Sequence, residues 1–426
     1  MKFAIVTFGC RVNQADSTDI ERQLRTAGGR PADAEQADLV VVNTCSVTAS
    51  ADHGARQLIR KISRKNPSVR IVVTGCYATR ASEDLVTLPG VAAVIPNHDK
   101  STLVPTLLQH PDVADLTTAV RFGDGEGACG DRIVPGGSGR TTYTLRVQTG
   151  CDEACAYCII PSTRGAGRSM PLARVLEEVD RIESEGFKEA ALTGVHIGSY
   201  GRDLDPALTL DDLLDALDAH PTKLVFRISS LEPMDCDERI VDLVARSDRF
   251  APHFHLPLQN ASDRLLRAMR RPYTLDAYQR LVSLIRERIP HAGIGSDMVV
   301  GFPGEQPEDV DVNLEYLTQS PLTYLHVFPY SDRPGTEATG MSEKVPKQRI
   351  RERARAVREK GADLAARFRA SQCGTVRPAL TINGGRIAVT DNYLKVGISP
   401  TVPDNQRVRV RITSSAEPLT GELVEH

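Results

Sequence analysis

The chain has 426 residues, a length that predicts two or three domains rather than one. Its hydrophobic content of 41% and charged content of 25% are typical of a globular protein, and no apolar run is long enough to cross a membrane. The net charge of −3 gives no general attraction to nucleic acid, but it does not exclude local basic surfaces. The N-terminus reads as a strand without a signal peptide, so we expect a cytoplasmic protein with no membrane partner.

Residues 1–122 alternate apolar segments with helical patterns and form the first expected domain. Four strands are expected, at residues 1–9, 38–44, 69–75 and 92–95. Because each is apolar throughout, the pattern indicates an α/β domain with a parallel sheet covered on both faces. Cys10, Cys45 and Cys76 each follow a strand, and the carboxyl ends of parallel strands share one edge. We therefore expect a three-cysteine iron–sulfur site there. The alternative is that cysteine, a good core residue, happens to end three strands.

Residues 123–140 are rich in glycine and are expected to form a linker, in which Cys129 is incidental. Strand and helix patterns resume in a second expected domain, residues 141–371. Its six expected strands are at residues 143–148, 190–196, 224–230, 253–259, 293–300 and 324–330. Six strand–helix units predict an incomplete version of the eight-unit barrel, a partial (β/α)6 barrel whose open side admits a bulky substrate.

Cys151, Cys155 and Cys158 form a Cys-x3-Cys-x2-Cys motif just after the first of these six strands. Three thiolates from one loop can hold three corners of an iron–sulfur cube, whose fourth iron is then open to a small chelating ligand. The alternatives are a chance group of structural thiols and a zinc knuckle, which needs a fourth cysteine or histidine close by. Nine cysteines in a chain expected to be cytoplasmic also favour metal ligands over disulfides.

Polar residues and a glycine recur at the carboxyl ends of the barrel strands, where barrel enzymes bind their ligands. They are Thr193, Gly194, His196, Arg227, Ser229, Glu232, Gln259, Asn260 and Asp297. Gly194 leaves room for a ligand beside the backbone. Ser229, Glu232 and Gln259 can hydrogen-bond a ribose or an amino-acid group, and Arg227 can pair with a carboxylate. For each residue alone, the alternative is a polar side chain that is satisfied within the protein.

The third expected domain, residues 372–426, contains short strands and turn residues typical of a small β-barrel. Its strands are expected at residues 376–382, 386–390, 393–398 and 407–412. Patches of arginine and lysine, including Lys395, predict contacts with phosphates, and Tyr393 is a candidate stacking group. The basic segment 343–369 is expected to be either a phosphate-contacting helix or a solvated helix face with salt bridges.

The 151–158 motif, with Tyr157 directly before its last cysteine, resembles the radical S-adenosylmethionine (SAM) superfamily. The resemblance implies that SAM chelates the open iron. The expected SAM-binding residues are Tyr157, Thr193, Gly194, Arg227, Ser229, Glu232 and Gln259. Together with the N-terminal cysteines, the partial barrel and the basic tail, essentially the whole chain resembles the radical SAM methylthiotransferases. That resemblance implies two 4Fe–4S clusters, sulfur delivery from the N-terminal cluster, SAM as radical source and methyl donor, and a TRAM domain that binds RNA.

Four segments are most similar to the family branch that acts on N6-threonylcarbamoyladenosine at position 37 of tRNA. They are 9–14 (GCRVNQ), 43–48 (NTCSVT), 158–161 (CIIP) and 390–396 (TDNYLKV). One departure is Ser162-Thr163 before Arg164, where that branch more often has an aromatic residue. The alternatives are the same reaction on N6-isopentenyladenosine in tRNA and methylthiolation of a ribosomal-protein aspartate. A non-catalytic electron carrier or RNA-binding iron sensor would instead need closed, four-ligand clusters.

The resemblance implies three partners: the tRNA anticodon loop, a reducing electron donor such as a flavodoxin or ferredoxin, and a sulfur source. A hydrogen on adenine carbon 2 is too weakly acidic for removal by a base, which explains the need for a radical. The threonylcarbamoyl carboxylate needs a cation in its pocket, because an unpaired buried carboxylate is costly. Arg164 and Arg333 are the expected cations near the barrel mouth. Further expected substrate contacts are Asp297, Tyr393 and Lys395.

Overall fold

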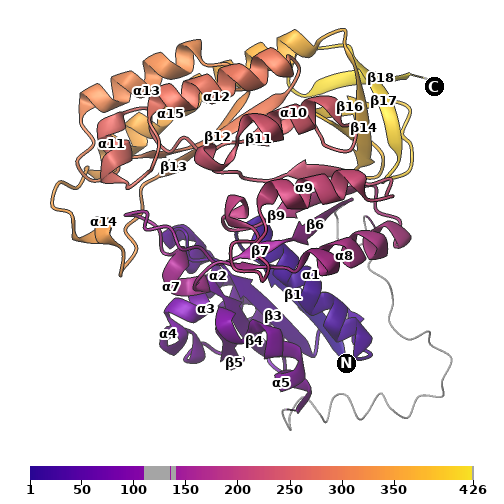
Figure 1. The fold of residues 1–426 in the computed structure, drawn as a ribbon. Helices are drawn as coiled ribbons and strands as arrows, with labels where there is room; N and C mark the ends of the chain where they lie inside the picture. Colours follow the sequence, from indigo (N-terminus) through magenta and orange to yellow (C-terminus); the bar gives the residue numbers. More distant parts are fainter. Residues whose placement is uncertain (110–134, 136–140, 425–426) are drawn as a thin grey trace.

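The computed structural model describes residues 1–109, 135 and 141–424, and Cys129 and most of the expected linker lie outside these residues. Figure 1 shows an N-terminal α/β part, a central part with two groups of parallel strands, and a small C-terminal β-barrel beside the second group. In the described residues, no helix is both long enough and apolar enough to span a membrane.

The N-terminal part contains a five-stranded parallel sheet with the order β2-β1-β3-β4-β5. Its strands are β1 Lys2–Thr7, β2 Arg30–Pro31, β3 Leu39–Thr44, β4 Arg70–Gly75 and β5 Val91–Ile95. Its helices are α1 Arg11–Thr26, α2 Ala49–Lys65, α3 Cys76–Arg80, α4 Ser82–Val86 and α5 Leu103–Gln109. Val40 and Val42 pack with Ile59 of α2, whereas Leu39 packs with Leu24 of α1 on the opposite face. This two-sided burial confirms the predicted covered sheet and explains why β3 is apolar throughout.

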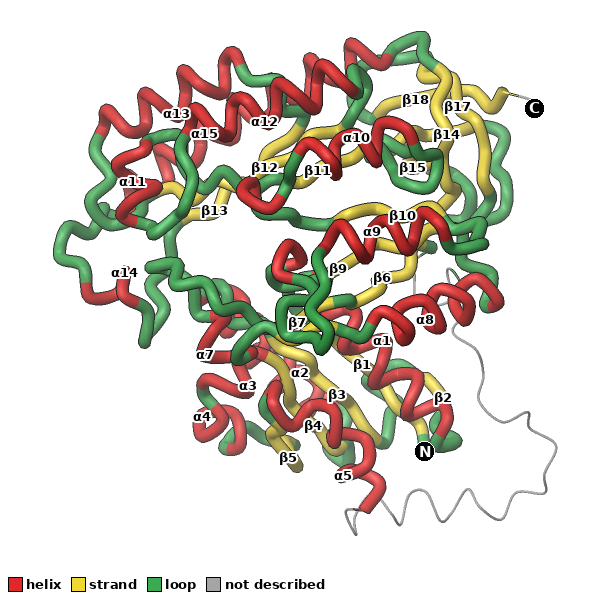
Figure 2. The backbone as a smooth tube through the Cα atoms, in the orientation of Figure 1, coloured by secondary structure: helices red, strands yellow, loops and turns green. Residues whose placement is uncertain are grey.

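The central part is the predicted partial barrel of six parallel strands, arranged as two three-stranded sheets (Figure 2). The first sheet contains β6 Thr142–Arg146, β9 Glu189–Thr193 and β10 Val225–Ile228. The second contains β11 His253–His255, β12 Gly293–Val300 and β13 Tyr324–Pro329. Single bridges between Phe226 and Phe250 and between Ser230 and His255 link the two sheets. β11 is shorter than expected, because Pro257 has no N–H to donate and Gln259 has a φ of 64°.

Most helices of the central part cover the outer side of these sheets, whereas α7 packs against α3 of the N-terminal part, and the last is one long basic helix. They are α7 Ile160–Arg164, α8 Leu172–Ser184, α9 Leu210–Ala219, α10 Glu238–Arg246, α11 Asp263–Ala268, α12 Leu275–Arg288, α13 Pro307–Gln319, α14 Glu337–Gly340 and α15 Lys347–Gln372. A two-stranded hairpin, β7 Gln148–Thr149 and β8 Arg168–Ser169, flanks the 151–158 cysteine loop. α15 packs along β13 and α13, and its Arg353 pairs with Glu305. Some of its basic side chains therefore stabilise the packing of this helix.

The C-terminal part is a closed five-stranded barrel with the order β14-β15-β16-β18-β17. Its strands are β14 Val376–Ile382, β15 Ile387–Thr390, β16 Lys395–Ile398, β17 Arg407–Ile412 and β18 Leu419–Val424. The expected small barrel is confirmed, but sequence reasoning missed β18. The alternation of apolar and polar residues in LTGELV was the available signal for that strand.

The turn between β15 and β16 packs against the floor of the partial barrel. Asn392 is buried and its Nδ2 donates to the carbonyl of His291 and to Oε1 of Gln372, both at 2.9 Å. Gly293 lies under this turn, and a Cβ there would be only 2.4 Å from the Asn392 carbonyl oxygen. The contact thus requires glycine at this position and joins the C-terminal barrel to the central part.

Candidate functional site

Three cysteines meet at the carboxyl edge of the N-terminal sheet. Cys10 is exposed, whereas Cys45 and Cys76 are buried, and none of them forms a disulfide. Gly9 has a φ of 95°, and a Cβ there would lie 2.5 Å from the Cβ of Cys45, so the loops after β1 and β3 approach closely. Burial, together with the neighbouring Cys10 and Cys76 thiols, raises the pKa of Cys45 to about 11. A cationic metal centre would offset this cost, because it favours the thiolate form.

The second group is Cys151, Cys155 and Cys158, on the loop between β7 and α7. The backbone N–H of Glu153 donates to the Cys151 sulfur at 3.4 Å, and Arg271 Nη1 donates to the Cys155 sulfur at 3.1 Å. Burial and the neighbouring thiols raise the pKa of Cys158 to about 12. Donors aimed at the sulfurs favour thiolates, so the donor set fits an iron–sulfur cluster with three protein ligands.

Two charged side chains support the 151–158 loop. Arg271 is buried and also pairs with Glu232, which links that strand-end carboxylate to Cys155. His196 Nε2 lies 2.7 Å from Asp235; although burial opposes it, hydrogen bonds to Asp235 and Cys151 raise the pKa of His196 to about 9. Asp235 therefore holds the His196 ring beside the 151–158 loop. Sequence reasoning missed Arg271, since no local motif marks it.

A cavity of about 220 Å³ is lined by Cys158 and by the loop that follows Cys45. Segments from three parts of the chain line it: Val47, Thr48, Tyr157, Cys158, Ile159, Ile160, Gln259, Asp297, Val299, Phe328, Pro329, Tyr330, Ser331 and Arg333. Val47 and Thr48 come from the loop after Cys45, and Cys158 belongs to the second group. A ligand in this cavity would contact both cysteine loops and the carboxyl ends of β12 and β13. That is the place where a radical and a sulfur donor could act on the same atom.

The expected cofactor-binding residues fall into two groups. Tyr157 and Gln259 line the cavity. Thr193 is buried with its hydroxyl donating to the Ala191 carbonyl, and the space beside Gly194 is filled by Gln148, whose Oε1 would lie 3.0 Å from a Cβ. Ser229 is also buried. The Thr193 hydroxyl, the space beside Gly194 and the Ser229 side chain are thus hydrogen-bonded, filled or buried within the protein.

Arg227 has its carboxylate partner inside the protein. Its Nη2 lies 3.0 Å from Glu189 Oε2, and its Nη1 donates to the Asp391 carbonyl at 2.8 Å. The guanidinium also lies 5.2 Å from the ring centre of Tyr393. Arg227 therefore anchors the C-terminal barrel to the floor of the partial barrel, and it does not present a free cation to SAM.

Tyr393 lies at this floor and packs on its own chain. Its ring centre is 4.5 Å from that of His253, and Arg11 Nη2 donates to its hydroxyl at 3.2 Å. Tyr393 as a whole remains 39% exposed. Lys395 lines a neighbouring cavity of about 720 Å³. Neither residue lines the 220 Å³ cavity.

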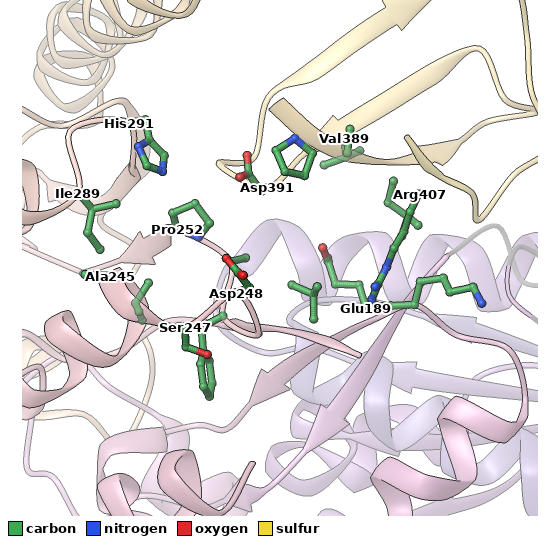
Figure 3. A pocket seen from close by; sticks show the side chains of 18 of the residues that line it. Glu189, Ala245, Ser247, Asp248, Pro252, Ile289, His291, Val389, Asp391 and Arg407 are labelled. Carbon is green, nitrogen blue, oxygen red and sulfur yellow. Dashed lines mark hydrogen bonds between the residues drawn. The ribbon is translucent and has the colours of Figure 1, made fainter. Parts of the chain in front are cut away.

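A further cavity of about 470 Å³ separates the C-terminal barrel from α10 and α12 (Figure 3). Arg407 of β17 reaches across it and donates to the Lys188 carbonyl at 2.9 Å. Asp248, His291 and Asp391 face it from different elements, as Figure 3 shows. No cysteine lines this cavity, and its charged groups do not converge on one point. We assign it no catalytic role.

The two expected substrate cations occupy different positions. Arg164 is buried between the N-terminal and central parts, where its Nη2 lies 2.9 Å from Asp16. Arg333 lines the 220 Å³ cavity; its Nη1 lies 2.7 Å from Asp52, and its buried Nε has no hydrogen-bond partner among the described residues. Arg333 thus remains a candidate for a substrate carboxylate, whereas Arg164 holds two domains together.

Asp16 connects these parts through a buried charge cluster. Lys100, Arg146 and Arg164 all pair with its carboxylate, and these cations hold its pKa well below the usual range although burial opposes this. Asp16→Asn should lower the free energy of unfolding by about 3 kcal/mol, because the largely buried Lys100 and Arg164 lose their carboxylate partner. Denaturant unfolding monitored by circular dichroism checks this, with exposed Asp33→Asn as control. Equal stability of the two variants would contradict the structural role.

Asp297 lines the cavity from β12 and contacts two histidines. His255 Nε2 lies 2.9 Å and His326 Nδ1 lies 3.1 Å from its Oδ1. Although burial opposes it, the hydrogen bonds to both rings lower the pKa of Asp297 to about 2. The carboxylate is therefore ionised at neutral pH, and it makes this wall of the cavity negative.

Comparison with known proteins finds two family matches in separate segments of the chain. Residues 2–96 match the family described as uncharacterized protein family UPF0004, and residues 145–317 match the radical SAM superfamily. A threonylcarbamoyladenosine tRNA methylthiotransferase of Aquifex aeolicus is 35% identical, over 93% of this chain and 96% of the relative. One from Bacillus subtilis is 31% identical, over 99% and 96%. A tRNA-2-methylthio-N(6)-dimethylallyladenosine synthase of Paenarthrobacter aurescens is 32% identical, over 99% and 82%.

Solved structures agree with the fold. The radical SAM methyltransferase TsrM from Kitasatospora setae, with cobalamin and a 4Fe–4S cluster bound, superposes with a TM-score of 0.54. The match covers 79% of this chain and 77% of that chain, at 17% identity, so it bears on the fold alone. The identities and coverage of the methylthiotransferases decide the family. The chain belongs to the radical SAM tRNA methylthiotransferases, enzymes whose cofactors are SAM and two 4Fe–4S clusters.

Proposed function

We propose that this enzyme places a methylthio group on carbon 2 of N6-threonylcarbamoyladenosine at position 37 of tRNA, with SAM as radical source and methyl donor. The observation that carries the proposal is the 220 Å³ cavity, which both cysteine loops line. The names of the Aquifex aeolicus and Bacillus subtilis relatives support this nucleoside. The dimethylallyladenosine synthases among the relatives keep the isopentenyl nucleoside as the alternative.

Each cysteine group has its own part in this proposal. Cys151, Cys155 and Cys158 would hold the cluster that binds SAM, and Cys10, Cys45 and Cys76 would hold the second cluster. When bound, these groups supply a carbon-centred radical and a transferable sulfur. Arg271 and His196 would stabilise the sulfurs of the first group through the contacts described above. Tyr157 and Gln259 would contact SAM from the cavity wall.

We also propose domain boundaries at residues 122, 140 and 371, with the C-terminal barrel as a TRAM-like module. Its basic strands, together with Lys395, would hold tRNA phosphates so that the anticodon loop reaches the cavity. A flavodoxin or ferredoxin would supply electrons and a separate donor would supply sulfur. We place the reaction in the cytoplasm, where tRNA is available.

The substrate is tested directly with two tRNAs. Anaerobically reconstituted enzyme should methylthiolate tRNA that carries threonylcarbamoyladenosine and leave isopentenyladenosine tRNA unchanged, as measured by mass spectrometry of digested nucleosides. The threonylcarbamoyl carboxylate needs a donor in the cavity, and the Arg333 guanidinium lines it. The opposite preference would assign the protein to the isopentenyl branch.

Arg333→Met should lower kcat/KM for threonylcarbamoyladenosine tRNA by about 10- to 100-fold, because a charge-assisted hydrogen bond to the carboxylate is lost. The exposed Arg280→Met on α12, far from the cysteine loops, serves as the matched control. Arg80 remains beside Asp52 in the Arg333 variant, so Asp52 keeps one cation. Unchanged kcat/KM in Arg333→Met would remove Arg333 from the substrate site.

A further inference from the structure

Three metal-binding side chains converge on the inner wall of the partial barrel, next to the substrate cavity. His255 lies on β11, Asp297 on β12 and His326 on β13, which are adjacent strands of one sheet. One donor atom from each lies within 4.8 Å of the other two. Sequence reasoning singled out Asp297 but neither histidine.

The strand register explains this convergence. Asp297 and His326 are paired partners of β12 and β13, so their side chains leave the sheet on the same face. His255 is paired with Gly295, which precedes Asp297 by two residues on that face. Both histidine nitrogens approach the same carboxylate oxygen, Oδ1, at 2.9 and 3.1 Å. The three donor atoms therefore face one point instead of forming two separate pairs.

A second layer of contacts holds His255 in place. Gly295 has no side chain, and a Cβ there would lie 2.0 Å from Tyr324 Cζ, so the Tyr324 ring lies across β12. The Tyr324 hydroxyl is 3.0 Å from His255 Nδ1 and 2.8 Å from His253 Nε2. It can accept the Nδ1 proton of His255 while donating to His253, so that Nε2 could ligate an ion in place of its hydrogen bond to Asp297. Outer hydrogen bonds of this kind are typical of metal-binding histidines.

We propose that His255 Nε2, Asp297 Oδ1 and His326 Nδ1 bind one divalent transition-metal ion, such as Zn²⁺ or Fe²⁺. Two imidazoles and one carboxylate on a single face form a ligand set that leaves further coordination positions open. His326 is the most exposed of the three, with 57% of its side chain accessible, so an ion can reach the site from solvent. The site uses none of the six cysteines assigned to the clusters.

The open positions of the ion would face the cavity, because Asp297 also lines it. The ionised Asp297 would otherwise repel the carboxylate of a threonylcarbamoyl group in the same cavity. A cation bound between the two carboxylates would attract both of them. The substrate carboxylate could then ligate the ion beside Arg333. This use of the site rests on the proposed function, whereas the metal site itself does not.

Zn²⁺ binding to the reconstituted enzyme, without tRNA, tests the site. Equilibrium dialysis with metal analysis should find one Zn²⁺ per chain, in addition to the cluster iron, in the unmodified enzyme. His326→Ala and Asp297→Asn should each weaken this binding by at least about tenfold, since each removes a ligand. His98→Ala, which removes an exposed histidine outside the site, should bind as the unmodified enzyme does.

Tyr324→Phe provides a finer readout, because it keeps all three ligands and removes only the outer hydrogen bond. Its Zn²⁺ affinity should fall by about 10- to 100-fold. The proposal is overturned if the holoenzyme binds no additional Zn²⁺, or if His326→Ala and Asp297→Asn, with intact cluster absorbance, bind it as tightly as the unmodified enzyme. In that case the three groups form only a hydrogen-bonded cluster. The comparison of the two tRNA substrates does not depend on whether Zn²⁺ binds.

Discussion

Replacing Cys155 with alanine is expected to leave one 4Fe–4S cluster per chain and to abolish both SAM cleavage and methylthiolation. Cys155 is one of three sulfurs on the 151–158 loop, and a cluster held by only two protein thiolates is not retained. Its loss also removes the acceptor of the Arg271 hydrogen bond. Iron and sulfide analysis, with chromatographic assay of 5′-deoxyadenosine, measures both effects. Iron should fall from about eight to about four atoms per chain.

Cys373→Ala is the matched control for this experiment. Cys373 is an exposed free cysteine at the end of α15, outside both cysteine groups. Its variant should keep two clusters and full activity. Two clusters in Cys155→Ala, or a single cluster in the unmodified chain, would contradict the assignment of the two sites.

Cys45→Ala is expected to separate the two reactions. The variant should still cleave SAM to 5′-deoxyadenosine, because the 151–158 loop and its supporting residues are unchanged. It should form no methylthio product, since Cys45 is the buried centre of the N-terminal group and its neighbouring loop lines the cavity. Parallel assays of 5′-deoxyadenosine and of modified nucleosides measure this separation.

A buried cysteine outside both groups controls for simple loss of packing. Cys236 is buried and belongs to the core of the central part, so Cys236→Ala tests the cost of removing a buried thiol. This variant should retain methylthiolation. Normal methylthiolation by Cys45→Ala would show that the N-terminal group does not deliver the sulfur.

Local patterns in the chain predicted most of the architecture. The apolar segments predicted the covered parallel sheet and the six parallel strands, because strand burial imposes a residue composition that is visible locally. The missed strand β18 lies in a short, half-exposed segment, whose period-two signal is weak. The two cysteine groups were also accessible from sequence. Chain topology places the carboxyl ends of parallel strands together, and the 151–158 spacing is short enough to converge without long-range contacts.

The tertiary structure alone decided which charged residues reach the cavity. Arg164 and Arg333 are equivalent candidates by sequence, and each pairs with an aspartate, but only Arg333 lines the 220 Å³ cavity. Arg333 meets Asp52 across 281 residues, and no local pattern encodes such a contact. The same holds for Arg271 and for the grouping of His255, Asp297 and His326. Pairing between distant residues depends on strand register and domain packing, which are set by the whole core and not by any one segment.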